Sequence, residues 1–339
     1  MWWKITWLCG QQQGVTVITQ LENFFGKLNS LYGSIKNNVH CTNVIMDAKK
    51  YLRQIPQRDY VFAKLPYNLS YTIKSDVWGQ FSSNGWFNQI AVNPTLVSDD
   101  YYKYSGHKML LMTTLSHELC HANQKACGLL EYNLQNTSFG DVFRVYKMTE
   151  IETALLEAVI EHELVKKTEF KDFDISSGLG FLYYYCLDKE NGDIQKAKRD
   201  FVLLCWTNSY NKIQTSNTRL KSICQNVIQH WYTSYTKDAI QCALKQKFTQ
   251  KNAYTPIQVI DACLQRMGLN GVIKPELFLQ NGSDNAKTDN RKRTVTLLTQ
   301  SGKKYCKYRM RSNELKVTWF KNQDTRILHT MLKNADKQK

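Results

Sequence analysis

No stretch of this 339-residue chain resembles a membrane span. The richest apolar run, from Gly180 to Leu187, is much shorter than the roughly 18 to 20 residues that cross a bilayer as a helix. The first ten residues are apolar, but they lack a basic leader and are followed at once by three glutamines, which is not typical of a secretory signal. We therefore expect no transmembrane segment, and a protein that is cytoplasmic or exported without a conventional signal peptide.

Paired cysteine motifs are also missing. Ten cysteines are scattered along the chain without a Cys-x-x-Cys pair, which argues against a structural zinc knuckle and against a disulfide framework. Several lie in apolar helical patterns, as Cys205 does after Phe201 and Val202. We expect reduced and mostly buried thiols, which favours the cytosol. The sequence shows no internal repeat either.

Acidic residues are scarce in the second half of the chain. Residues 1–170 hold 16 Lys and Arg against 15 Asp and Glu, whereas the remaining residues carry nearly all of the net charge of +16. The segments 291–293 and 303–311 interleave cations with aromatics, which suits phosphate contacts and base stacking. The same pattern suits an anionic membrane surface, an acidic protein partner or a merely solvated basic face. No helix-turn-helix, zinc-finger or RNA-binding sequence pattern accompanies it.

The periodicity of apolar residues changes several times along the chain. It predicts helices at 15–32, 42–52 and 107–126, a helix opening near Thr149, and a wholly helical stretch from 176 to 268 that ends at Gly268. It predicts strands at 68–74, 78–82, 86–92, 293–298 and 315–320, the second and third forming a hairpin, and a polar linker at 281–288. The spacing of Thr149 and Glu152 fits a capping box at the start of a helix.

Residues 117–121 read His-Glu-Leu-Cys-His within a predicted helix. Two histidines four residues apart point the same way from a helix, so His117 and His121 can bind one metal ion. Zinc favours such ligands, and a catalytic zinc site keeps one position open for water. Glu118 lies one step round the helix, where it can take a proton from water as a general base. This spacing is a metalloprotease signature, although two ordinary histidines beside an exposed glutamate would look the same.

A third metal ligand is needed. The metzincin pattern requires glycine at 124 and histidine at 127, but this chain has Gln124 and Cys127. Cys127 can ligate zinc in principle, yet without the glycine turn we expect it to stay on its helix. The next predicted helix carries Glu150, Glu152 and Glu157 as better candidates. Glu150 and Glu157 lie seven residues apart on one face, whereas Glu152 is expected to cap the helix.

Groups that assist the metal are less visible in the sequence. A tyrosine, histidine or arginine usually stabilises the oxyanion in such sites, and Tyr132, Arg144, Tyr146 and His162 are all nearby in sequence. The pattern does not choose among them. Asp141 is a candidate for orienting a histidine, or for capping a turn.

The segment from His117 to Gln124, with the later run 150–154, resembles an uncharacterised family of bacterial metallopeptidase-like proteins. Their pattern runs H-E-L-x-H-A-x-Q and then E-A-D-A about thirty residues later. The resemblance covers residues 60–170 and implies a zincin of the gluzincin type, with Glu150 as third ligand and Glu152 as an accessory carboxylate. Glu152 stands where the family has Asp, so the two carboxylates could exchange roles. It also implies that the strand at 89–94 is an edge strand lining the cleft.

These observations predict an α+β protein in three parts. Residues 1–170 would form a zincin-like metallopeptidase domain with a small sheet and an active-site helix, 171–270 a helical region, and 285–339 a basic C-terminal module containing strands. The expected function is zinc-dependent hydrolysis of a protein or peptide. The alternatives are a non-enzymatic protein that binds nucleic acid or an anionic surface through its basic half, and a zinc hydrolase acting on another amide.

Overall fold

The structure is a computed structural model. It describes residues 39–65, 69–74, 77–83, 88–130, 138–167, 178–245, 254–280, 284, 286–298, 302–311 and 314–320. The helix predicted at 15–32 lies outside the described residues.

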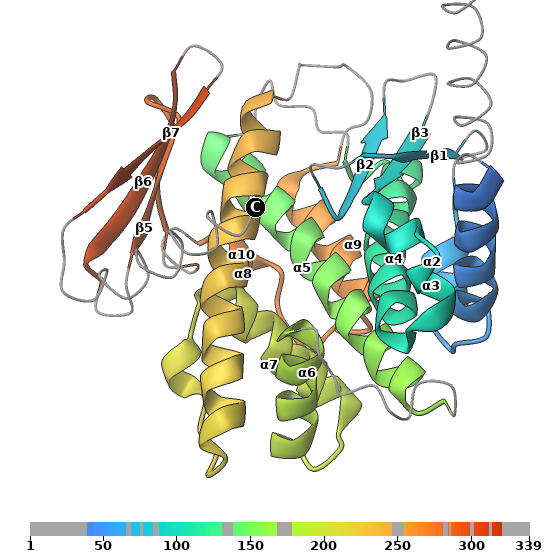
Figure 1. The fold of residues 1–339 in the computed structure, drawn as a ribbon. Coiled ribbons are helices and arrows are strands. Elements are labelled where there is room, and N and C mark those ends of the chain that lie inside the picture. The colour runs from blue at the N-terminus through green and yellow to red at the C-terminus, as the bar shows by residue number, and fades with distance from the viewer. Residues whose placement is uncertain are drawn as a thin grey trace, which may run out of the picture.

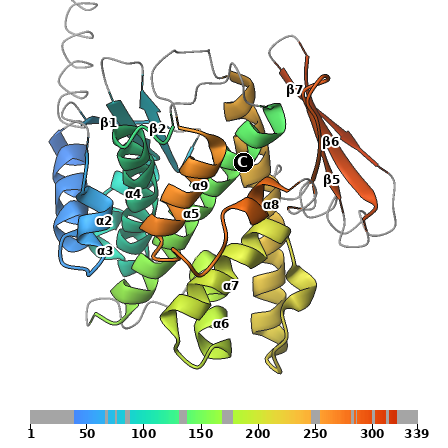
Figure 2. The same ribbon diagram turned by 180° about the vertical axis from the view of Figure 1, so that it is seen from behind.

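The chain is a mixed α+β protein in which long helices dominate and two small sheets lie at opposite sides (Figure 1). Helix α5 (Phe139–Val165) runs through the centre, and α4 (Ser105–Ala126) packs beside it. The other helices are a segment at 39–52, α2 (Arg58–Phe62), η2 (Pro94–Val97), α3 (Asp100–Lys103), α6 (Gly178–Lys189), α7 (Ile194–Thr207), η4 (Tyr210–Lys212), α8 (Thr218–Lys245), α9 (Pro256–Arg266) and α10 (Glu276–Leu279). Seen from behind, α9 lies against α5 (Figure 2).

The first sheet has three strands, β1 (Leu69–Ile73), β2 (Gly79–Ser83) and β3 (Asn88–Val92), in the order β1-β3-β2. The antiparallel pairing of β2 with β3 confirms the predicted hairpin, and β1 runs parallel to β3. The prediction that the strand before α4 is the edge strand is wrong. Because β3 is flanked on both sides and buries Ile90 and Val92, it is the central strand. Strands β1 and β2 are the end strands among the described residues, and β2 contacts α4, as β3 does.

Helix α4 confirms the helix predicted at 107–126, and Gly128 beyond its end has a φ of +75°, which glycine adopts without strain. The predicted start of the next helix at Thr149 is wrong. Helix α5 begins ten residues earlier, where the side chain of Ser138 accepts a hydrogen bond from the backbone N–H of Asp141. Thr149 lies inside the helix and donates its hydroxyl to the carbonyl of Tyr146, so the Thr-x-x-Glu spacing is no capping box here.

Helix α5 is buried on two faces. Ile151, Leu155 and Ala158 belong to a core shared with α6, α7, α8 and α9, whereas Leu156 and Ile160 belong to a second core with the 39–52 helix, β3 and α4. A helix that is apolar on several faces is typically buried inside the protein. The same helix therefore ties the N-terminal and helical regions together, and the predicted domain boundaries remain predictions.

The described part of the stretch predicted as wholly helical contains the α-helices α6, α7, α8 and α9 and the short helix η4, with turns between α6 and α7. Helix α9 begins after its cap Thr255 and ends before Gly268, as predicted for the end of this stretch. Within the described residues, no helix combines the length and apolar character that a bilayer span needs. The eight cysteines whose side chains the structure describes are all free, and seven of these are buried.

The second sheet is antiparallel in the order β4-β5-β6-β7. Strands β5 (Thr294–Leu298) and β7 (Glu314–Trp319) confirm two predictions, while β6 (Lys304–Arg311) is the basic segment for which no strand was predicted. The linker predicted at 281–288 is wrong in part, because β4 (Ala286–Asp289) begins inside it. Ala286 is fully buried in the core of this sheet, which also contains Phe143 of α5. The polar residues around Ala286 in the sequence therefore predicted a linker where the structure has a strand.

Candidate metal centre

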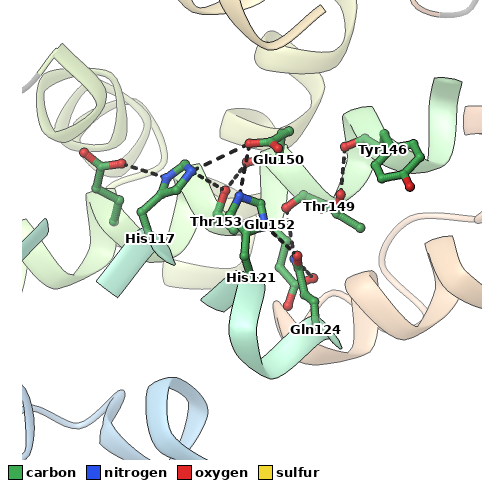
Figure 3. A network of polar contacts seen from close by, with 9 residues as sticks. His117, His121, Gln124, Tyr146, Thr149, Glu150, Glu152 and Thr153 are labelled. Atoms are coloured by element: carbon green, nitrogen blue, oxygen red, sulfur yellow. Dashed lines mark hydrogen bonds and ion pairs between the residues drawn. The ribbon is translucent and has the colours of Figure 1, made fainter. Parts of the chain in front are cut away.

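Two adjacent helices bring three ligand atoms to one point (Figure 3). His117 and His121 project from the same face of α4, and Glu150 approaches them from α5. The carboxylate Oε2 of Glu150 lies 3.6 Å from Nε2 of His117 and 3.4 Å from Nε2 of His121. One ligand atom from each residue lies within 4.8 Å of the others, so the group could hold a metal ion.

These separations suit tetrahedral coordination. Nitrogen and oxygen atoms bonded at about 2.0–2.1 Å to a tetrahedral zinc ion lie about 3.3–3.4 Å apart, by the geometry of a tetrahedron. The two distances from Glu150 to the histidines are 3.4 and 3.6 Å. The residues thus fit a divalent ion with only small movements, and two imidazoles with one carboxylate leave a fourth position for water or substrate.

The other ring nitrogen of each histidine already has a partner. Nδ1 of His117 lies 3.3 Å from Oε2 of Glu157, and Nδ1 of His121 lies 2.9 Å from Oε1 of Gln124. Both partners accept hydrogen bonds, so each Nδ1 carries a proton, and a metal that displaces any proton on Nε2 can bind the lone pair there. Outer partners of this kind orient most metal-binding histidines. Glu157, predicted as an alternative ligand, therefore serves as a support for His117.

The charges at the site are strongly coupled. Burial alone would lower the pKa of His117, but its hydrogen bonds with Glu150 and Glu157 hold that pKa well above the usual range. Burial likewise opposes protonation of His121, yet the neighbouring Glu150 raises its pKa. For Glu150 the effect of burial is outweighed by His121 and His117, which lower its pKa to about 2. A carboxylate this acidic is ionised at neutral pH, as a metal ligand must be.

Glu118 is held beside the ligands by strand β2. Its side chain is buried, with 6% exposure, and burial raises its pKa against the opposing effects of the two histidines and of the Phe81 amide. That amide hydrogen bonds with the carboxylate. At Gly79 an added Cβ would lie 2.8 Å from Oε1 of Glu118 and 2.6 Å from the methyl of Thr114, so only glycine lets the strand approach this closely.

Glu152 is turned away from the histidines. Its carboxylate accepts hydrogen bonds from Tyr60, from Gln124 at 2.9 Å and from Arg266 of α9. It is fully buried and contacts neither imidazole among the described interactions. The expectation that Glu152 caps a helix is therefore wrong, and the structure brings Glu150 rather than Glu152 to the Nε2 atoms of His117 and His121.

Two of the candidates for oxyanion stabilisation have partners away from the histidine pair. Arg144 pairs with Asp141 in the first turns of α5, and His162 packs edge-on against Tyr183. Tyr146 packs between the central core and the second sheet, and Tyr132 lies outside the described residues.

The aromatic ring beside His117 instead comes from α8. The ring of Tyr235 lies 6.1 Å from that of His117, and it stacks closely on Trp231. Tyr235 is more than a hundred residues from the motif, and no local pattern in the sequence points to it. Gln124 is different, because its place three residues after His121 on one helix makes it a predictable neighbour.

No family model, no curated protein and no solved structure matches this chain. The geometry of the site therefore has to carry the functional argument without a relative.

Proposed function

We propose that this chain is a zinc-dependent hydrolase that cleaves peptide bonds. The observation that carries the proposal is the convergence of Nε2 of His117, Nε2 of His121 and Oε2 of Glu150 on one point, with Glu118 on the adjoining turn. Two imidazoles and one carboxylate are a ligand set typical of catalytic zinc, since they leave a coordination position open. Glu157 and Gln124 lie against the Nδ1 atoms of the two histidines, which favours metal coordination through Nε2.

A zinc ion held there would supply Lewis-acid polarisation of a carbonyl and would acidify water. Glu118 is suited to accept the proton at its carboxylate and to pass it to the leaving amine. The Phe81 amide orients that carboxylate, and burial by β2 keeps bulk water from competing for it.

The choice of a peptide substrate rests on the edge strand. Strand β2 is an end strand of its sheet among the described residues, and it contacts α4 beside Glu118. An end strand offers backbone N–H and C=O groups to an extended chain, which can add to the sheet by hydrogen bonding. A peptide bound in this way would place its backbone carbonyls beside Glu118, which favours a peptide over other amides.

Metal analysis of the full chain tests this proposal. After loading with zinc and removal of unbound metal, we expect about one zinc ion per chain, and time-dependent cleavage of a peptide library followed by mass spectrometry. The double variant His117→Ala/His121→Ala should lose both the zinc and the cleavage. The matched double variant His40→Ala/His107→Ala, which removes two histidines elsewhere, should retain them. Wild-type protein that binds no zinc would overturn the proposal.

A second candidate function has its own observation. In the second sheet, Thr296 of β5 pairs with Lys287 of β4 on one side and with Lys307 of β6 on the other. Arg309 of β6 pairs with Lys316 of β7. These four cations lie on the face opposite the buried row that includes Val295. All four cations are exposed or half-buried. A sheet face with cations and hydroxyls suits the phosphate backbone of a nucleic acid.

Binding of a single-stranded oligonucleotide at several salt concentrations tests this second function. Replacing the four cations by glutamine should weaken binding and reduce the slope of log affinity against log salt by up to about 3, at roughly 0.7 for each phosphate that the protein no longer neutralises. Four matched replacements in the N-terminal region, at Lys50, Arg58, Lys64 and Lys103, should leave the slope unchanged. Equal effects of the two sets, or preferential binding to anionic lipid vesicles, would contradict a nucleic-acid site on this sheet.

A further inference from the structure

A buried chain of hydrogen bonds connects the candidate metal centre with helix α9. It begins at Gln124, a fully buried residue on α4. The amide nitrogen of Gln124 donates to the carbonyl of Thr149 at 3.0 Å and to Oε2 of Glu152 at 2.9 Å. Both of these groups can only accept, so the amide has one orientation. Its oxygen must therefore face Nδ1 of His121, 2.9 Å away.

Glu152 is the next link, and its position is itself fixed from two sides. Tyr60 of α2 donates its hydroxyl to the carboxylate, and Nε of Arg266 donates to the same oxygen. The guanidinium of Arg266 also lies over the ring of Tyr60, with 4.7 Å to the centroid, and Nη1 lies 3.6 Å from Sγ of Cys127. Glu152 has no exposed surface, so these contacts replace water as the partners of its charge.

We propose that Arg266 is a positioning residue for the metal centre, which acts through Glu152 and Gln124 to fix the ring of His121. The proposal rests on the metal-binding part of the proposed function. Arg266 stands 114 residues from Glu152 in the sequence, so the helical region completes the site rather than merely packing beside it.

The physical reason is that each side chain in this chain of hydrogen bonds can satisfy its neighbours in one orientation only. Without Arg266, the buried carboxylate of Glu152 would have to turn toward other donors, and the amide of Gln124 would keep only the Thr149 carbonyl as a fixed acceptor. His121 would then lose the acceptor that keeps its proton on Nδ1 and its lone pair directed at the metal. Changes to such outer partners typically weaken metal binding about 10- to 100-fold.

The main experiment measures zinc affinity of the full-length protein by competition with a chelator. We expect Arg266→Gln to weaken zinc binding about 10- to 100-fold. Cobalt(II) bound in place of zinc provides a second readout, because its visible absorption reports the geometry of its ligands. We expect the band to shift or broaden in Arg266→Gln, and Arg266→Lys to restore part of the affinity, because it returns a cation near Glu152.

Two further variants separate positioning from folding. Arg266→Gln leaves a buried carboxylate poorly paired and can fail to fold. Gln124→Met keeps the Arg266–Glu152 pair but removes the hydrogen bonds of Gln124 with His121, Glu152 and the Thr149 carbonyl. It therefore breaks the chain on the His121 side of Glu152 and should reproduce the loss of affinity and the cobalt shift. Lys198→Gln is the structural control. Lys198 donates to the carbonyl of Met267 at 3.1 Å, so this variant loosens the same end of α9 without touching the chain of hydrogen bonds.

The outcomes distinguish this inference from the proposed function. Wild-type protein that binds neither zinc nor cobalt defeats the proposed function. If wild type binds zinc but Gln124→Met binds it with unchanged affinity and an unchanged cobalt spectrum, the positioning role of Arg266 is wrong. The same holds if Lys198→Gln weakens zinc binding as much as Arg266→Gln does. Loss in Arg266→Gln and Gln124→Met together, with Lys198→Gln at the wild-type level, supports it.

Discussion

Replacing Glu118 by glutamine is expected to lower the rate of peptide hydrolysis about 10²- to 10⁴-fold, the usual contribution of a positioned general base. Glutamine has nearly the same shape, and its amide oxygen can still accept the hydrogen bond from the Phe81 N–H. It cannot accept a proton at neutral pH. The variant should therefore remain folded and bind zinc with nearly the wild-type affinity, while the turnover number falls.

The matched control is Glu163→Gln. Glu163 lies on α5, thirteen residues beyond Glu150 and therefore about 20 Å along the helix, and it pairs with Lys166 at the surface. This variant should hydrolyse peptides at the wild-type rate. Turnover by Glu118→Gln within a few-fold of wild type, with zinc bound, would show that another group takes the proton and that the proposed role of Glu118 is wrong.

The candidate ligand cluster was predictable in part, because helix periodicity fixes which of its residues share a face. The spacing of His117 and His121 dictates a shared face, and the structure places both rings on it. The seven-residue spacing of Glu150 and Glu157 likewise predicts one face, and both carboxylates contact His117. The sequence could not show whether Glu150 or Glu157 lies nearer Nε2 of His117, because that depends on how far α5 is shifted along its axis relative to α4.

Other features depend on contacts that local sequence does not record. The Thr149–Glu152 spacing mimics a helix start, but α5 is already three turns long at that point because Ser138 caps it. Strand β3, which precedes α4, pairs with β1 on one side and with β2 on the other, so it is the central strand of its sheet and not an edge strand. Arg266 and Tyr235 reach the site from distant helices. Such partners become visible only when the helices are packed.

The identity of the third ligand gives the second large expected effect. Structural zinc sites with four ligands bind with about 10–16 kcal/mol, so one ligand contributes roughly 3 kcal/mol, which is a factor of about 150 in affinity. We expect Glu150→Ala to weaken zinc binding by about that factor, because it removes the single carboxylate that lies between both Nε2 atoms. The measurement is competition with a chelator, in parallel with thermal unfolding of the metal-free protein.

Two neighbouring carboxylates make the comparison specific. Glu157→Gln removes the acceptor charge behind His117 but no ligand, so it should weaken zinc binding only about 10- to 100-fold. Glu163→Gln, on the same helix, should bind as wild type. If Glu157→Gln lost more affinity than Glu150→Ala, the ligand would be Glu157 and Glu150 would be the support, which requires α5 to rotate on metal binding. Because both glutamates contact the same imidazole, the order of the two effects, rather than the size of either one, identifies the ligand.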